Sequence, residues 1–209
     1  MKYNDKQVQI MEAAEELFSE KGFDGTSVRD ISEKAGVNLA MISYYFGSKE
    51  KLLEALFDFR GEDTVMKLES MISDKKSTPL QKVYSLIEYY VDKFMNQQCF
   101  HKVMSREQVT NQRGVTTTLI LQLKKRNQAL VEQLIHSGQK SGDFKKNIDI
   151  PLMMATLVGT VSHLVTTQHY YREINNLQNL SDDDVDKHIR KKLNNHLKFL
   201  FKAILTHEA

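Results

Sequence analysis

Apolar residues recur along most of the chain at the spacing of an α-helix, and no segment shows the alternation of a strand. The clearest stripe comprises Ile10, Met11, Ala14, Leu17 and Phe18. It lies on one face of an otherwise charged helix, which Lys21 and Gly22 are expected to end. The pattern therefore predicts an all-α protein.

Two short helices are predicted to follow. Ser27 with Asp30 three residues later is a variant of the capping box, and Gly36 ends the helix that it begins. Asn38 caps the next helix, which runs to about Tyr45. A much longer helix begins at Ser48 and carries Leu52, Leu53, Leu56, Phe57 and Phe59.

Further helices are expected at about 79–97, 100–112, 115–140, 150–172 and 182–206. Pro79 and Pro151 fall in first turns, where proline is tolerated. Asp149 and Ser181 are the cap residues. The acidic run Asp182–Asp184 favours a helix start, although a metal site is the alternative reading.

The segment from Ser27 to Lys49 predicts two short helices joined by a tight turn at residues 35–37. Helices that cross steeply need small residues at the contact, and Ser32 and Ala35 supply them. Gly36 permits the positive φ of the turn. Val37 and Ile42 seat the second helix, whose opposite face then projects with dimensions that fit a DNA major groove.

Composition is that of an ordinary globular protein, with 209 residues, 41% hydrophobic and 27% charged. The longest apolar stretch, 151–165, is too short and too polar to span a membrane. No secretory signal opens the chain. Cys99 is the single cysteine, so no internal disulfide forms, and a reducing cytoplasm is the expected location.

Charge alone does not point to nucleic acid. The net charge is +2, and residues 1–50 carry six basic and nine acidic side chains. A DNA-binding domain usually has a positive field, so the count argues mildly against DNA. The interpretation depends on Lys2, Lys6, Arg29 and Lys49 facing the duplex while the glutamates of the first helix face away.

Four blocks, AAEELFSEKGF, GTSVRDI, AGV and YYFGSKEKLL, occur in order between Ile10 and Leu56. This run resembles the N-terminal domain of the TetR family of bacterial regulators. The resemblance implies a three-helix helix-turn-helix DNA-binding domain at 1–47. A larger helical domain at 48–209 would then bind an effector and form the dimer.

The resemblance also implies roles in binding double-stranded operator DNA. Arg29 would reach a base edge or a phosphate, Lys49 would contact a phosphate, and Ser27 would donate to a phosphate. The recognition helix would present Asn38, Leu39, Ala40, Ser43, Tyr44 and Tyr45. At least one tyrosine hydroxyl is expected on a phosphate, while one of the two rings alternatively packs between domains. Two positions depart from the family, which commonly has tyrosine at Ser43 and alanine at Ser32.

Two stripes fit the family's dimer, in which the last two helices form a four-helix bundle with the partner. Small residues recur at Ala155, Gly159 and Ser162. The last helix carries Val185, Ile189, Leu193, Leu197 and Leu200. The alternative is that both stripes belong to the protomer's own core.

A small-molecule effector, hydrophobic or amphipathic, is expected in the second domain, with no cofactor and no metal. Residues of suitable type are Tyr89, Tyr90, Phe94, Phe100, His101, Met104, Met153, His163 and Tyr170. Each of these residues is alternatively ordinary core, and the two histidines are alternatively structural.

Two rival functions are weaker. An enzyme needs paired titratable groups, and the sequence has neither a glycine-rich phosphate loop nor an HExxH motif. Cys99 and His101, two apart on a helix, point in different directions. An architectural DNA-binding protein would not need so long a C-terminal domain. Activation instead of repression remains an alternative, because the sequence does not show where an operator lies.

Overall fold

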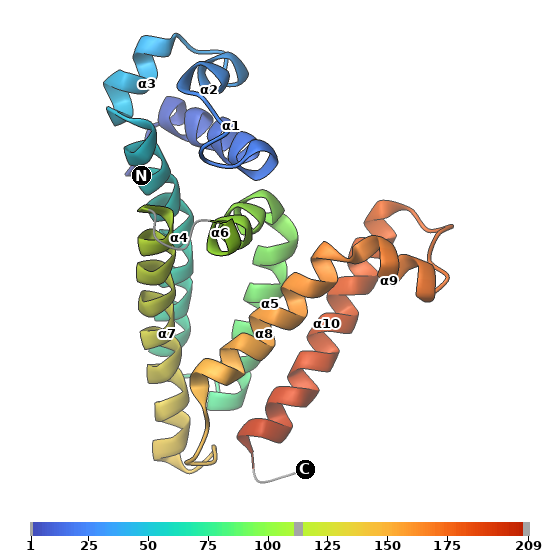
Figure 1. Cartoon of the computed structure of the whole chain (residues 1–209). Helices are drawn as coiled ribbons and strands as arrows, with labels where there is room; N and C mark the ends of the chain where they lie inside the picture. The colour runs from blue at the N-terminus through green and yellow to red at the C-terminus, as the bar shows by residue number, and fades with distance from the viewer. Residues whose placement is uncertain (1, 111–114, 207–209) are drawn as a thin grey trace. The chain divides into compact units, whose positions relative to one another are not determined.

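The computed structural model describes the backbone of residues 2–110 and 115–206, and in these ranges it contains ten α-helices and no strand (Figure 1). They are α1 (Asp5–Lys21), α2 (Val28–Lys34), α3 (Leu39–Phe46), α4 (Lys49–Ser73), α5 (Pro79–Asn96), α6 (Gln98–Thr110), α7 (Val115–Ser141), α8 (Ile150–Thr166), α9 (Gln168–Ile174) and α10 (Asp182–Leu205). The all-α expectation is confirmed for this part of the chain. Residues 111 and 112, predicted to end a helix, lie outside it.

Several predicted caps are present. Ser27 and Asp30 form the expected capping box at α2, and Asn4 and Gln7 form a further one at α1 that was not predicted. Asp149 accepts from the Leu152 N–H at the start of α8. Ser181 accepts from the Asp184 N–H, so the acidic run occupies the first turn of α10 as expected. The local sequence therefore fixes most helix starts.

The chain packs as two compact units, and the division falls within α4, between α5 and α6, and within α7. The first unit comprises residues up to Met66 together with Gln98–Asn127, and the second comprises Lys67–Gln97 and the residues from Gln128 onward. The boundary expected after residue 47 separates a DNA-binding domain from an effector-binding domain by function, and it stays a prediction. By packing, the helix-turn-helix forms one body with α6 and parts of α4 and α7.

The core of the first unit is built from the apolar stripe of α1. Ile10, Met11 and Phe18 are fully buried. They belong to the same cluster as residues from α2, α3, α4, α6 and α7, among them Ile31, Ile42, Leu52, Leu56, Phe100 and Ile120. Fully burying one such side chain contributes about 1.5–3 kcal/mol, so this cluster holds the three N-terminal helices on α4 and α6.

The second unit has its own core, formed by α5, α8, α10 and parts of α4 and α7. Ile189, Leu193 and Leu197 of α10 lie inside this core, with exposed fractions of 0–2%. These three side chains are therefore unavailable to a partner, and for them the alternative holds that the stripe belongs to the protomer's own core. Ala155 and Gly159 on α8 are exposed, and Ser162 and Leu200 are half-buried.

The helix expected at 150–172 is broken, which corrects that prediction. α8 ends at Thr166, and α9 follows at an angle of 76°. The hydroxyls of Thr166 and Thr167 donate to the carbonyls of Ser162 and His163, four residues earlier. Such back-bonding bends helices and here marks the break.

In the described ranges, no single helix is long and apolar enough to cross a membrane. By length and composition, only the bent pair of α8 and α9 passes the same test.

Candidate nucleic-acid interface

The turn between α2 and α3 has the geometry that the sequence predicts. Gly36 has a φ of 60°, and the Val37 N–H donates to the Ser32 carbonyl over 3.0 Å. Ser32 and Ala35 are 5% and 4% exposed. Because both side chains are small, the two helices approach closely, and the prediction of a helix-turn-helix is confirmed.

Helix α3 has one seated face and one free face. Ile42 and Phe46 are buried in the core of the first unit. The opposite face carries Leu39, Ala40, Ser43 and Tyr44, and all four are exposed. Tyr44 is the most open, at 83%. A rigid helix with a free face of this composition offers one hydroxyl donor, one phenol and apolar groups for a DNA groove.

Asn38 caps α3, in addition to the contact with DNA that is expected of it. Its side-chain oxygen accepts from the Ala40 N–H over 2.9 Å, which caps α3. The amide nitrogen of Asn38 points to no partner among the described residues, and the side chain is exposed. It therefore has two N–H donors left for a base edge.

At the start of α2, some of the hydrogen-bonding groups expected to contact DNA are already used within the protein. The Ser27 hydroxyl donates to the Asp30 carboxylate over 2.7 Å, and the Ser27 N–H donates to the same oxygen over 2.9 Å. These two hydrogen bonds lower the pKa of Asp30. Ser27 is consequently engaged in the cap, while Arg29 is exposed and forms no ion pair with any described residue. Arg29 is the freer of the two expected contacts.

The two tyrosines differ in their surroundings. The rings of Tyr44 and Tyr45 meet edge to face with centroids 5.1 Å apart. Tyr45 is half-buried and also contacts Phe46, at 6.4 Å. Tyr45 thus braces Tyr44, whose hydroxyl is the one presented to solvent.

Lys49 lies in an unexpected environment. Its Nζ donates to the carbonyls of Phe23 and Thr26, over 2.8 and 2.9 Å, and lies 4.3 Å from the centre of the Phe23 ring. Two of its three donors are therefore used inside the protein. Lys49 joins the start of α4 to the loop before α2, which makes it a positioning residue.

Helix α6 contacts the same loop and the last turn of α1. The Phe23 N–H donates to the carboxylate of Glu107 over 3.4 Å, and Arg106 donates to the Glu20 carbonyl over 3.0 Å. Glu107 is only 4% exposed. Sequence reasoning missed both residues, because nothing in the local pattern of α6 indicates which distant backbone it meets.

A buried ion pair links α1 and α4. The Arg60 Nε donates to the Glu15 carboxylate over 2.7 Å, and Glu15 is 5% exposed. Burial raises the pKa of Glu15, while Arg60 and the Phe100 N–H act in the opposite direction. Since Phe100 lies in the first turn of α6, this carboxylate also satisfies a free N–H of that helix.

The basic residues expected to face DNA are mostly committed elsewhere. Lys2 forms ion pairs with Asp58 and Glu62, and Lys6 donates to Gln9. Together with Lys49, this leaves Arg29 as the member of the set without such a contact in the described residues.

The residues expected in the effector pocket are divided between the two units. Phe100, His101 and Met104 lie in α6 of the first unit, whereas Tyr90, Phe94 and Met153 are buried in the second. His163 and Tyr170 are exposed. α5 and α6 contribute to different cores, and the role of these residues in binding an effector stays a prediction.

Comparisons with known proteins agree with this architecture. The family model described as bacterial regulatory proteins, tetR family, matches residues 10–56. A second model, described as tetracyclin repressor-like, C-terminal domain, matches residues 79–194, which is more than half of the chain.

The chain is 32% identical over 139 residues to the probable HTH-type transcriptional regulator YttP of Bacillus subtilis. This alignment covers 65% of each protein, just under two thirds of that regulator. Among solved structures, the regulator FadR of Bacillus subtilis in complex with stearoyl-CoA has a TM-score of 0.67 at 22% identity, over 91% of this chain and 96% of that one. The ketosteroid regulator KstR2 of Mycobacterium tuberculosis has a TM-score of 0.69 at 18% identity, over 99% of this chain and 97% of that one. By its two family models, the protein belongs to the TetR family of bacterial transcriptional regulators.

Proposed function

We propose that the protein is a ligand-responsive transcriptional repressor that binds a palindromic operator as a homodimer. The observation that carries this proposal is the free face of α3, set on a helix-turn-helix whose core is complete. A face of this kind, backed by buried Ile42 and Phe46, enters the major groove as a rigid body.

Sequence recognition is assigned to four side chains. Ser43 and the Asn38 amide hydrogen-bond base edges, while Leu39 and Ala40 contact thymine methyl groups. Tyr44 and Arg29 contact phosphates and set the register of the helix on the duplex. Lys49 acts indirectly, by fixing the loop from which α2 starts.

The dimer is proposed to form through the exposed faces of α8 and α10. On α8, Leu152 is 64% exposed, and a Cβ added at Gly159 would meet no atom within 4 Å. On α10, Phe199 is 75% exposed. Exposed apolar side chains beside small residues favour a close helix contact with a second copy. The interface therefore uses Ala155, Gly159, Ser162 and Phe199, in place of the buried leucine stripe.

The effector is proposed to be hydrophobic or amphipathic. Tyr90, Phe94 and Met153 lie in the apolar core of the second unit, between α5 and α8, and burial raises the pKa of Tyr90. The similar structures include FadR in complex with stearoyl-CoA and a ketosteroid regulator, which supports an apolar ligand class. Binding that favours a dimer with a different spacing of its recognition helices would release the operator.

The test is selection of duplex DNA from a random pool by the purified protein, with its mass in solution measured by sedimentation. The proposal expects a palindrome whose half-sites lie about 34–36 Å apart, or a multiple of this, bound by a dimer or a pair of dimers. No enrichment at low salt by a folded dimer would overturn it.

A further inference from the structure

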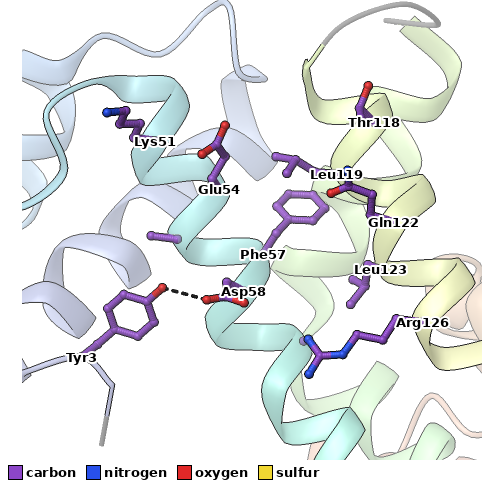
Figure 2. Close-up of a pocket in the computed structure, with 12 residues that line it drawn as sticks. Tyr3, Lys51, Glu54, Phe57, Asp58, Thr118, Leu119, Gln122, Leu123 and Arg126 are labelled. Atoms are coloured by element: carbon purple, nitrogen blue, oxygen red, sulfur yellow. Dashed lines mark hydrogen bonds between the residues drawn. The ribbon is translucent and has the colours of Figure 1, made fainter. Parts of the chain in front are cut away.

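A groove of about 840 Å³ lies within the first unit, between α4, the first part of α7 and the segment before α1 (Figure 2). Every lining residue belongs to that unit, so the groove is separate from the apolar core of the second unit. Its volume is in the range of small-molecule sites. None of the expected effector residues lines it.

The floor of the groove is apolar. Phe57 from α4 and Leu119 and Leu123 from α7 project into the space between the two helices, as Figure 2 shows. The helices approach closely below it, because a Cβ on Gly61 would lie 2.7 Å from the Leu123 Cδ1. This glycine lets α7 lie against α4 and closes the floor.

One rim charge is already neutralised. Asp58 forms an ion pair with Lys2 and accepts from the Tyr3 hydroxyl over 3.2 Å. The Tyr3 ring also meets Phe59 edge to face, with centroids 6.1 Å apart. These contacts hold the N-terminal segment against α4 as one wall of the groove.

The remaining rim charges are predominantly positive. Lys51 and Arg126 are exposed side chains that form no ion pair with any described residue, and Glu54 is the single acidic side chain left beside them. In Figure 2 the Arg126 side chain extends from α7 toward α4, next to Leu123. A planar guanidinium in this position presents a fork of donors that matches a carboxylate.

We propose that this groove binds a small amphipathic carboxylate. The carboxylate pairs with Arg126, and the apolar body lies along Leu123, Phe57 and Leu119 toward the Lys51 end. This site is additional to the effector site proposed for the second unit. It does not depend on operator recognition, because it rests only on groove residues.

The chain contains no tryptophan, which gives a clean reporter. Gln122→Trp places a single indole on the rim, on the exposed side of α7. Decanoate is titrated into this variant without DNA, and tryptophan emission is recorded. The proposal expects a saturable blue shift below about 1 mM, with decanol and decyltrimethylammonium binding at least about tenfold more weakly.

Two further variants locate the site. Arg126→Gln in the reporter background should weaken decanoate binding about tenfold or more, since an ionic hydrogen bond is lost. Lys125→Gln, an exposed neighbour on α7 outside the groove, is the matched control and should change binding less than about twofold. Circular dichroism checks that each variant is folded. The proposal would be overturned by an equal loss of decanoate affinity in both variants, or by the absence of a saturable shift in tryptophan emission. Tighter binding of decyltrimethylammonium than of decanoate would also overturn it.

Discussion

The Nζ of Lys49 donates to the Phe23 carbonyl over 2.8 Å and also lies over the Phe23 ring. With a second hydrogen bond to Thr26, it ties the first residue of α4 to the loop that leads into the helix-turn-helix. The family resemblance implied a phosphate contact at this position. On the basis of these contacts we propose that Lys49 acts as part of the scaffold that orients α2 and α3.

Replacing Lys49 by methionine should therefore lower stability. Two carbonyls would lose a charged donor, which costs about 1–3 kcal/mol in the free energy of unfolding, measured by urea denaturation. Operator affinity should fall, while the dependence of log affinity on log salt keeps its slope. Lys67→Met, an exposed change in the second unit, is the control. A slope reduced by about one with unchanged stability would show a direct phosphate contact.

Asn38→Ser should separate capping from base recognition. Serine caps a helix about as well as asparagine, so the free energy of unfolding should stay within about 0.5 kcal/mol. The two amide donors are lost, so base preference at the position read by Asn38 should relax by about 1–3 kcal/mol. The measurement is a competition among duplexes that differ at single base pairs. An unchanged preference with full affinity would mean that Asn38 is a cap alone.

Acid should weaken the start of α2. The Ser27 hydroxyl and N–H hold the pKa of Asp30 below its usual 3.8, so the folded state favours the ionised carboxylate. Its contribution to stability is present above the unfolded pKa and is lost as pH falls through the folded pKa. The stability difference between the natural chain and Asp30→Asn should thus be largest above about pH 5 and shrink toward about pH 3. Ser27→Ala should reduce this pH dependence, and a difference constant across the range would contradict it.

Phe199→Glu should prevent dimer formation. Phe199 is 75% exposed, and a carboxylate there would be desolvated on contact with a second copy. Sedimentation should report a monomer, and operator affinity should fall because the two half-sites no longer bind together. Gln133→Glu, an exposed change on α7, should leave the dimer intact. A dimer that survives Phe199→Glu would place the interface elsewhere.

Local signals predicted the helix-turn-helix well. Caps at Ser27 and Asn38, the turn glycine Gly36 and the buried Ile42 are all short-range features, and each lies where the sequence indicated. The role of Arg106 and Glu107 could not be predicted from local sequence, because it depends on contacts between residues about 85 positions apart.

Apolar stripes were less informative in the second unit. Periodicity shows that Ile189, Leu193 and Leu197 face an apolar surface, but the same pattern serves a core and a dimer interface. Phe199 was overlooked because it lies off the stripe. For the groove a signal was available: Gly61 interrupts a long helical pattern, and such a glycine often marks a close helix contact.

The claim that the free face of α3 reads the operator is tested most directly by one affinity ratio. The ratio compares the selected palindrome with a scrambled duplex of equal length, at one salt concentration, for the natural chain and for the Ser43→Ala, Tyr44→Ala double variant. The account predicts a ratio of about 10³ or more for the natural chain, falling at least about tenfold in the folded, dimeric variant. A ratio that stays the same in the variant would contradict the assignment of this face to DNA recognition.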